Sequence, residues 1–316
     1  MRALRFHDFG APSVLEIEDV PTPTPASGEL LVEVRAAAIN PSDPKNVAGL
    51  FEQTTLPRTP GRDFSGVIVS RGPHANRQVW GTGPGLGTTR DGAHAQFVCA
   101  PAQFIAPRPH NVSFEQAAGI GVPFTTAWAS IMDAGALKAD QTILIIGAAG
   151  AVGQAATQIA NWKGARVLAG ATASTPVRGA DAVINTRTED LRQRIFDLTE
   201  GRGADVVFDV VGGPMFEPGV RSLRLGGRYV VIASSGSRQV SFDLVDFYHN
   251  RAHLIGVDSN KFQAAELQRI MNELNHGFDA GALKVSNFEA VPFENAISAY
   301  ENVASKPGEP KQILTF

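Results

Sequence analysis

The stretch TILIIGAAGAVGQAATQIA, residues 142–160, decides the fold of this chain. It begins with an apolar run that is too short for a helix, and such an unbroken run of isoleucine and leucine is typical of a strand buried on both faces. The run ends in Gly147, Gly150 and Gly153, and small apolar residues at helical spacing follow. The pattern predicts a strand, a glycine turn and the beginning of a helix.

A turn of this kind is a candidate phosphate site, because free backbone N–H groups and the positive end of the helix dipole point at whatever lies over it. Two glycines match the dinucleotide fingerprint G-x-G-x-x-G, while an alanine stands at its first position. We predict cofactor contacts from the residues of the turn, Ala148, Gly150, Ala151, Val152 and Gly153. The alternative, from this stretch alone, is an ordinary turn of a parallel sheet that holds no ligand.

The composition is that of an ordinary globular protein of 316 residues with a net charge of −3, and the length favours two domains. Acidic and basic residues are spread along the chain, which argues against nucleic acid or an anionic membrane as a partner. No apolar run is long enough to cross a bilayer, and the opening MRALRFHDFG does not resemble a signal peptide. Cys99 is the only cysteine, which excludes an intrachain disulfide and agrees with a cytoplasmic location.

The remainder of the chain falls into two patterns. The first hundred or so residues are β-rich, with loops that hold the motifs NPSD and PGRDFSG. Later, strands alternate with helices, as in a parallel sheet. The predicted strands of that part are residues 142–146, 166–169, 182–184, 205–211, 228–233 and 254–257. Amphipathic helices at 262–274 and 292–304 and a closing strand, KQILTF, are predicted for the tail.

A β-rich first part of the chain holds NPSD and PGRDFSG, and AAGAVG, DVVGG and LGGRYV follow in that order. The order of these motifs along the chain resembles the medium-chain dehydrogenase/reductase superfamily. Within that superfamily, the resemblance is to the zinc-free quinone oxidoreductases. It implies an α/β fold in which a GroES-like β-barrel domain is made from both ends of the chain. A Rossmann domain, a doubly wound parallel sheet, is inserted into it. The domains implied are 1–117 with 258–316, and 118–257.

The same resemblance implies a protein without a catalytic metal. In zinc enzymes of the superfamily a cysteine stands in the place of Asn40, and a G-H-E motif occupies the place of Gly61, Arg62 and Asp63. A catalytic zinc needs three suitable protein ligands, and the four-cysteine lobe of a structural zinc is also missing from the sequence. Without a Lewis acid, a quinone or an α,β-unsaturated carbonyl is a suitable hydride acceptor, because the charge delocalises onto oxygen. We therefore expect hydride transfer from a nicotinamide to such a small molecule.

The resemblance also assigns roles to individual residues. It places Asn40 beside the nicotinamide ribose or the substrate oxygen. Lys45 could hold the ribose or stabilise the forming anion, as a lysine does in some relatives; a solvated lysine is the alternative. Thr126 matches a threonine near the cofactor, or is a helix-start hydroxyl. Further cofactor contacts are expected at the ends of two later strands, from Val210, Val211, Gly212 and Ala233.

The sequence draws attention to three other polar residues. Asp209, at the end of a predicted strand, is expected to form structural hydrogen bonds. Arg90 and His94 lie in a glycine-rich stretch, where they could line the rim of a substrate cleft or belong to a surface loop.

The choice of cofactor depends on the end of the second strand of the alternating part. An NAD enzyme places Asp or Glu there, whereas residues 168–179 hold no acid. Four residues of this stretch could bind a 2′-phosphate: Thr172, Ser174, Thr175 and Arg178. We therefore predict NADPH. Only about a dozen residues separate this strand from the next, so the helix that relatives have there is expected to be missing or cut to one turn.

Two alternatives to the reductase stay open. The chain could be an enoyl-thioester reductase of the same superfamily, or a regulatory or structural protein that binds NADPH without turnover. By analogy with relatives, a homodimer joined through the edge strand near residues 251–257 is expected.

Overall fold

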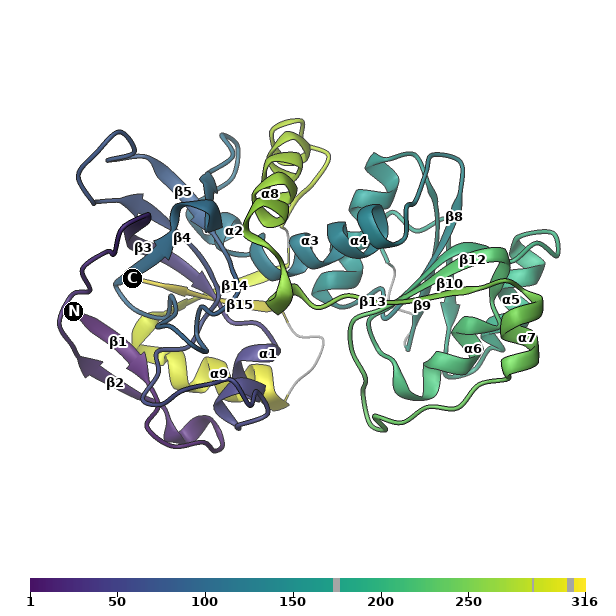
Figure 1. The fold of residues 1–316 in the computed structure, drawn as a ribbon, viewed down its shortest axis with the longest axis horizontal. Coiled ribbons are helices and arrows are strands. Elements are labelled where there is room, and N and C mark those ends of the chain that lie inside the picture. The colour runs from purple at the N-terminus through teal and green to yellow at the C-terminus, as the bar shows by residue number, and fades with distance from the viewer. Residues whose placement is uncertain (173–176, 286, 306–309) are drawn as a thin grey trace. The chain divides into compact units, whose positions relative to one another are not determined.

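The computed structural model describes residues 1–172, 177–285, 287–305 and 310–316. These residues form two compact units, Met1–Thr125 with Ser259–Phe316, and Thr126–Asp258 (Figure 1). The second unit is thus an insertion between the two segments of the first. The first division falls inside α3 (Gly121–Trp128), later in the chain than the 117/118 boundary expected above.

The first unit is built around a mostly antiparallel sheet. In the described part of the chain its strands follow the order β14-β15-β3-β4-β5-β7, and β6 also pairs with β3. β15 runs parallel to β14 and antiparallel to β3, while β1 and β2 form a separate pair. The strands are β1 (Arg2–Arg5), β2 (Glu16–Asp19), β3 (Glu29–Ala38), β4 (Asp63–Ile68), β5 (Gln78–Gly81), β6 (Phe97–Pro101), β7 (Ile105–Pro107), β14 (Phe288–Pro292) and β15 (Lys311–Thr315).

The helices of the first unit are short apart from α8. Besides α3 they are α1 (Ser42–Val47), α2 (Phe114–Ala118), α8 (Ala264–Asp279) and α9 (Ala296–Ser305). α2 begins with a capping box, in which the Ser113 hydroxyl accepts from the Gln116 N–H and the Gln116 side chain accepts from the Ser113 N–H. In α1, Pro44 falls within the first turn, where its missing N–H costs no helical hydrogen bond.

The second unit is a parallel sheet in the order β10-β9-β8-β11-β12-β13 among the described residues. Numbered along the chain, this is the order 3-2-1-4-5-6 of a doubly wound Rossmann sheet. The strands are β8 (Thr142–Ile146), β9 (Arg166–Ala171), β10 (Ala182–Asn185), β11 (Ala204–Asp209), β12 (Leu223–Val231) and β13 (His253–Gly256). The helices are α4 (Ala151–Trp162), α5 (Leu191–Leu198), α6 (Phe216–Val220) and α7 (Leu244–His249), and the π-helix is Ala129–Ala134.

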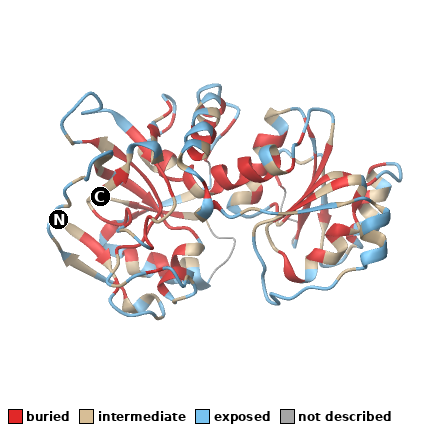
Figure 2. Cartoon of the chain, in the orientation of Figure 1, coloured by how far each residue is buried: buried red, intermediate tan, exposed pale blue. Residues whose placement is uncertain are grey.

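β8 is one of the two central strands of this sheet, with β9 on one side and β11 on the other. Ile143, Leu144 and Ile145 are completely buried, and Figure 2 shows buried residues along the strands of the sheet. Each such side chain stabilises the fold by about 1.5–3 kcal/mol relative to an exposed one. An apolar run buried on both faces therefore fixes the centre of the second unit.

The connection from β9 to β10 contains no helix in its described residues, 172 and 177–181. The Asp181 N–H donates to the Val167 carbonyl, and the Asp181 carboxylate accepts from the Val167 N–H at 2.7 Å. The chain thus returns to the beginning of β9 and enters β10 directly. For these described residues the structure agrees with the short crossover that the sequence length predicts.

Candidate functional site

The glycine turn lies at the carboxyl edge of the parallel sheet, the edge at which folds of this kind bind ligands. Gly147 has a φ of 82°, a left-handed conformation that favours glycine. Its N–H and that of Ala148 both donate to the Gly170 carbonyl, at 2.9 and 3.1 Å. The turn after β8 is therefore tied to the end of β9.

The amino end of α4 lies on this turn, and no side chain of the described residues caps it. Gly150 is the N-cap residue and is exposed, as is Ala151, while Val152 is half-buried. A Cβ at Gly150 would have the Gly147 carbonyl oxygen at an ordinary 3.5 Å as its contact. An open place thus lies beside the first N–H groups of α4, and it suits the diphosphate of a dinucleotide.

Side chains are excluded from two other faces of the turn. A Cβ at Gly153 would overlap the Gly147 carbonyl oxygen and lie 2.6 Å from the Ala148 Cα, so α4 packs on the turn through bare backbone. A Cβ at Gly147 would lie 2.6 Å from Val210 Cγ2 and 2.8 Å from Val211 Cγ2. The structure therefore brings the residues predicted after β11 against the glycine turn.

Asp209 shapes the chain after β11. Its Oδ1 accepts from the N–H groups of Val211 and Gly212 at 2.8 and 2.9 Å, which confirms the structural role predicted for it. Gly212 has a φ of 65°, and a Cβ there would overlap the Ala233 carbonyl oxygen. Gly212 and Ala233 are thus in contact at the same edge of the sheet.

The other residues predicted to contact the cofactor differ in burial, and two of them lie outside the described residues. Thr126 is buried, and its Oγ1 has no hydrogen-bond partner in the described part of the chain. A buried hydroxyl of this kind is costly unless a ligand or water satisfies it, so its position fits a cofactor contact. Thr172 directly follows β9 and is exposed. Ser174 and Thr175 lie outside the described residues.

Arg178 is exposed and lies toward the amino edge of the sheet. The carbonyl of its neighbour Gly179 accepts from Asn161 Nδ2 at 2.8 Å, in the last turn of α4. Asp181, three residues further on, is hydrogen-bonded to Val167 near the start of β9. From there the end of β9 is about 13 Å away along the strand. The backbone of Arg178 is therefore remote from the glycine turn.

Asn40 belongs to a buried polar cluster of the first unit. Its Oδ1 accepts from Lys311 Nζ at 2.6 Å, and its Nδ2 donates to Asp63 Oδ2 at 2.8 Å. Its backbone N–H donates to Asp43 Oδ2 at 2.7 Å. These three partners come from β15, β4 and α1. Lys311 and Asp63 hold the side-chain amide of Asn40 in one orientation, and Asp43 holds its backbone.

Sequence reasoning misses Lys311, because nothing in KQILTF distinguishes it from a residue of an ordinary closing strand. The pairing of β15 with β3 brings it to Asn40: Ile313 is opposite Ala38, and β3 ends there. A signal for this contact exists only in the register of two strands that are far apart in the chain.

Burial perturbs the charges of this cluster. It raises the pKa of Asp43 to about 7, with the Asp63 carboxylate adding to the shift. It lowers the pKa of Lys311, while Asp63 and Asp43 oppose that change. Arg62 and, to a smaller extent, Lys311 oppose the rise in the Asp43 pKa, so the buried acidic groups of the cluster have positive partners.

Lys45 and Ser42 lie on α1, close to Asn40 in the chain. Lys45 is exposed, and its side chain makes no ion pair or hydrogen bond with the described residues. Ser42 Oγ is buried and likewise has no partner among them. Both groups are thus available to a ligand, and Ser42 is a polar candidate that the sequence motifs did not single out.

Both interpretations offered for His94 are wrong. The side chain is fully buried, so it lies neither on a surface loop nor at the rim of a cleft. Burial lowers its pKa to about 4, so the ring is neutral at pH 7. The ring lies 3.2 Å from the Ala38 carbonyl through Nε2 and 2.8 Å from the Tyr300 hydroxyl through Nδ1. A carbonyl can only accept, so we assign the proton to Nε2, and Nδ1 accepts from Tyr300.

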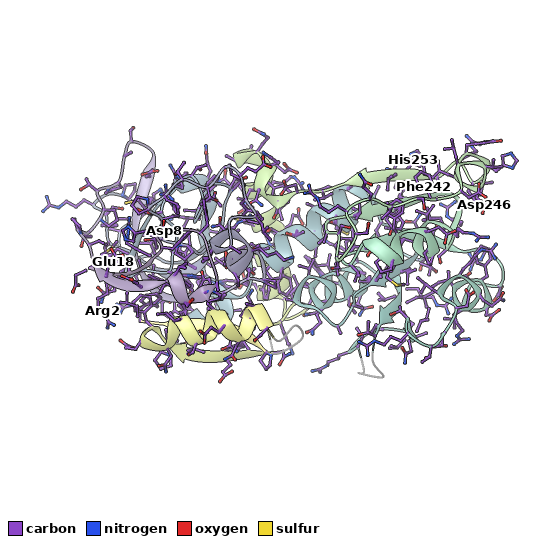
Figure 3. The ribbon with its side chains drawn as sticks, turned by 90° about the horizontal axis from the view of Figure 1, so that it is seen from below. Arg2, Asp8, Glu18, Phe242, Asp246 and His253 are labelled. Atoms are coloured by element: carbon purple, nitrogen blue, oxygen red, sulfur yellow. The ribbon has the colours of Figure 1, made fainter. Side chains whose placement is uncertain are left out.

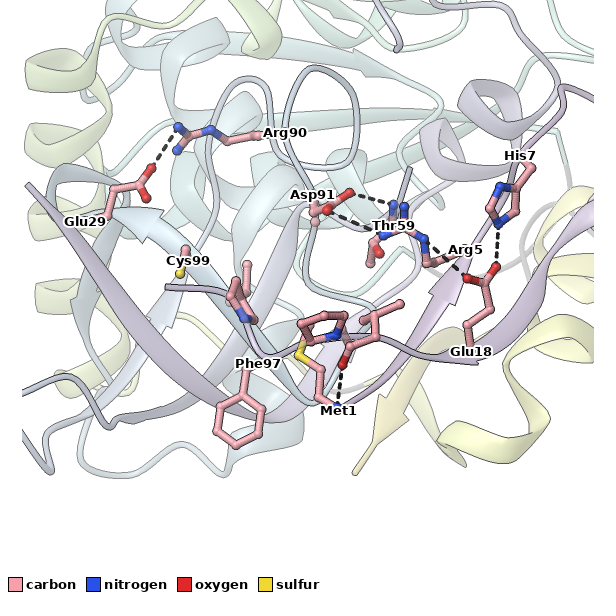
Figure 4. A pocket seen from close by; sticks show the side chains of 16 residues that line it. Met1, Arg5, His7, Glu18, Glu29, Thr59, Arg90, Asp91, Phe97 and Cys99 are labelled. Atoms are coloured by element: carbon pink, nitrogen blue, oxygen red, sulfur yellow. Dashed lines mark hydrogen bonds and ion pairs between the residues drawn. The ribbon is translucent and has the colours of Figure 1, made fainter. Parts of the chain in front are cut away.

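Arg90 lines a pocket of about 490 Å³ in the first unit (Figure 4). Its Nη2 pairs with Glu29 Oε1 at 2.8 Å. Neither Asn40 nor Lys45 is among the lining residues. The pocket is therefore separate from the predicted catalytic residues.

Cys99 also lines this pocket, and it is expected to react slowly with alkylating reagents. Burial raises the pKa of its thiol to about 11, and Glu29 adds to the shift. At pH 8 only about one thiol in a thousand is then ionised, and the thiolate is the reactive form. Mass spectrometry after iodoacetamide treatment should show alkylation roughly a hundredfold slower than that of glutathione. Equal rates would contradict this assignment.

The described residues lack two features, a membrane-spanning helix and a cluster of metal-binding side chains. None of their helices is long and apolar enough to span a bilayer. They also contain no group of three or more His, Cys, Asp or Glu side chains arranged to hold a metal ion.

Comparison with known proteins gives a family match in each half of the chain. Residues 26–110 match the alcohol dehydrogenase GroES-like domain, and residues 151–275 match the zinc-binding dehydrogenase family. The first match lies within the first unit, and the second covers most of the inserted unit. The predicted combination of a GroES-like domain with a Rossmann domain is confirmed.

Relatives match over nearly the whole chain. A zinc-type alcohol dehydrogenase-like protein of Schizosaccharomyces pombe is 38% identical over 294 residues, which cover 91% of this chain and 88% of that protein. The quinone oxidoreductase of Homo sapiens is 29% identical over 321 residues, with 99% and 97% covered. The structure of Escherichia coli quinone oxidoreductase complexed with NADPH has a TM-score of 0.88 at 26% identity, with 100% of both chains covered.

A GroES-like unit interrupted by a Rossmann unit, with the glycine turn after the first strand of its sheet, defines a medium-chain dehydrogenase/reductase. The chain belongs to this superfamily and, within it, to the quinone oxidoreductase-like group. The resemblance that the sequence motifs carry is thereby confirmed.

Proposed function

We propose that the protein is an NADPH-dependent oxidoreductase that transfers hydride to a quinone or an α,β-unsaturated carbonyl. The observation that carries the proposal is the amino end of α4, which no described side chain caps, over the turn at residues 147–153. The quinone oxidoreductase of Escherichia coli, whose fold this chain shares, is complexed with NADPH. Its name, and that of the human relative, support a quinone as acceptor.

The cofactor, when bound, supplies the hydride from its nicotinamide ring. The chain's own groups bind and orient it. The N–H groups of the first turn of α4 hold the diphosphate, and the Val210 and Val211 side chains beside Gly147 support the nicotinamide. The Thr126 hydroxyl, which has no partner in the described residues, supplies a further hydrogen bond.

Asn40 and Lys45 are the catalytic residues of this proposal. One Asn40 Nδ2 hydrogen goes to Asp63, which leaves the second for the substrate oxygen or the nicotinamide ribose. Lys311 fixes the direction of that hydrogen by holding Oδ1. The Lys45 ammonium holds the ribose or stabilises negative charge as it develops on oxygen.

The test is steady-state oxidation of NADPH, with menadione as the quinone and methyl vinyl ketone as the enone. We expect turnover on one or both, with a higher kcat/KM for NADPH than for NADH, and a loss of kcat in Asn40→Ala. Equal or better efficiency with NADH would contradict the cofactor assignment. Selective turnover of a crotonyl thioester would favour an enoyl-thioester reductase. Tight NADPH binding with no turnover on any acceptor would favour a non-catalytic protein.

We also propose a homodimer joined through the free edge of β13. β13 pairs with β12 and is the last strand of its sheet in the described residues. Leu254 on this strand is 43% exposed. α7 precedes it in the chain and exposes Leu244 and Tyr248. Figure 3 marks this end of the second unit by Phe242, Asp246 and His253. A free strand edge beside apolar side chains is a suitable surface for a second copy.

Leu254→Lys is expected to turn this dimer into a monomer, because a lysine on an edge strand opposes strand pairing. Light scattering coupled to gel filtration should give about twice 33.5 kDa for the wild type and 33.5 kDa for the variant. Leu50→Lys is the matched control, since Leu50 is also exposed but lies in the first unit. A monomeric wild type would refute the proposed dimer.

A further inference from the structure

We infer that Arg187, on the loop after β10, binds the 2′-phosphate of the cofactor and determines the preference for NADPH. The inference rests on the proposed NADPH dependence and names the residue that imposes it. Two observations carry it: the place of Arg187 in the sheet, and its exposed side chain, which has no partner among the described residues.

The end of β10 lies directly beside the end of β9. Asn185 is opposite Ala171 in the parallel register, and the Thr186 N–H donates to the Ala171 carbonyl at 2.9 Å. A Cβ at Gly170 would lie 3.3 Å from Thr186 Cγ2. Arg187 therefore leaves the sheet one residue beyond the last contact between the two strands.

Gly170 joins this place to the glycine turn. Its carbonyl accepts from the N–H groups of Gly147 and Ala148, at 2.9 and 3.1 Å. Along the carboxyl edge the order is thus the glycine turn, the end of β9 and the loop after β10. In a dinucleotide site the diphosphate lies over the turn, and the adenosine ribose lies at the end of the second strand. Arg187 emerges next to the place of that ribose.

The side chain of Arg187 is available to a ligand. It is exposed, and it forms no ion pair or hydrogen bond with the described residues. The loop itself is held, because Asn185 Oδ1 accepts from the Arg187 N–H at 3.0 Å and the Asn185 N–H donates to Glu189 Oε1 at 2.7 Å. The Glu189 carboxylate is already paired with Arg194 at 2.8 Å. A guanidinium of this kind can bind a phosphate through two parallel hydrogen bonds.

Arg178 does not share this position, since its backbone lies near the amino edge of the sheet, where Gly179 contacts Asn161. In this proposal Arg187 therefore takes the role that the sequence predicts for Arg178.

The test compares two fragments of the cofactor, 2′,5′-ADP and 5′-AMP, which differ in the 2′-phosphate. Isothermal titration calorimetry of the wild type should show tighter binding of 2′,5′-ADP. Arg187→Ala is expected to lower the affinity for 2′,5′-ADP by roughly tenfold or more and to leave the affinity for 5′-AMP within about twofold of the wild type. The affinity of Arg187→Lys for 2′,5′-ADP should lie between those of the wild type and Arg187→Ala, because lysine keeps the charge but cannot form two parallel hydrogen bonds.

Arg178→Ala is the matched control, because it removes the same side chain from another exposed position. It should keep the wild-type preference. A wild type that does not prefer 2′,5′-ADP would overturn the NADPH proposal and this inference together. If the wild type and Arg187→Ala both bound 2′,5′-ADP more tightly than 5′-AMP to the same degree, this inference alone would be overturned. A preference lost in Arg178→Ala and kept in Arg187→Ala would do the same.

Discussion

Replacing Asp63 with alanine is expected to lower the midpoint of thermal unfolding of the first unit by roughly 10 °C. Asp63 is fully buried, and its Oδ2 accepts from Asn40 Nδ2 and from the Val122 N–H at the start of α3, both at 2.8 Å. Without it both donors lose their acceptor, and Lys311 loses a compensating carboxylate. Breaking a buried charged network of this kind costs about 3–5 kcal/mol. Differential scanning calorimetry measures the shift.

Two variants accompany this measurement. Asp63→Asn keeps an oxygen acceptor and removes the charge, so its midpoint should fall between the wild type and the alanine variant. Asp8→Ala removes an exposed carboxylate from the same unit and should leave the midpoint unchanged within error. If the two alanine variants unfolded at the same temperature, the cluster around Asn40 would not stabilise the first unit.

Replacing Gly153 with valine is expected to destabilise the second unit by more than about 3 kcal/mol. The new side chain would overlap the Gly147 carbonyl oxygen and the Ala148 backbone, which cannot rotate away as a side chain could. α4 must then move off the turn. Hydrogen exchange measured by mass spectrometry resolves the effect by segment, and peptides from β8 and β11 should exchange roughly a hundredfold faster.

Gly150→Ala separates packing from binding at the same turn. Gly150 has a φ of −75°, which any residue adopts, and its Cβ would meet the Gly147 carbonyl oxygen at 3.5 Å. Exchange in β8 should therefore stay at the wild-type rate, while NADPH affinity falls because a methyl group stands beside the first N–H groups of α4. Equal exchange in both variants would contradict the packing account.

Local sequence patterns predict the centre of the fold well. They predict the ends of some helices and strands less well, because tertiary packing determines where those elements begin and end. β8 spans residues 142–146 as predicted, because an apolar run bounded by a glycine turn leaves no other register. β12 begins at Leu223, ahead of the predicted 228, because its pairing with β11 continues across Gly226 and Gly227 with a shift in register. α8 continues beyond the predicted end at residue 274, to Asp279, and buries Phe278 against Phe124.

The candidate site divides in the same way. The glycine turn and the residues after β11 follow from motifs, since each is read from a few consecutive residues. Lys311 and Arg187 acquire their places from strand register, which connects residues far apart in the chain or on separate strands. The sequence places His94 in a glycine-rich stretch, which suggests a loop, whereas the fold buries it, and Gly61 approaches its ring so closely that a Cβ would not fit.

The place of β15 sets the order in which the two units can be completed on the ribosome. β15 lies between β14 and β3, so the sheet of the first unit stays divided until residues 311–315 have emerged. All strands of the second unit have been made by residue 258. At a synthesis rate of about 5–20 residues per second, the interval between the synthesis of β3 and that of β15 is on the order of 15–60 s. During that interval the inserted unit can fold alone, and the half-built sheet is the part of the nascent chain that a holding chaperone would cover.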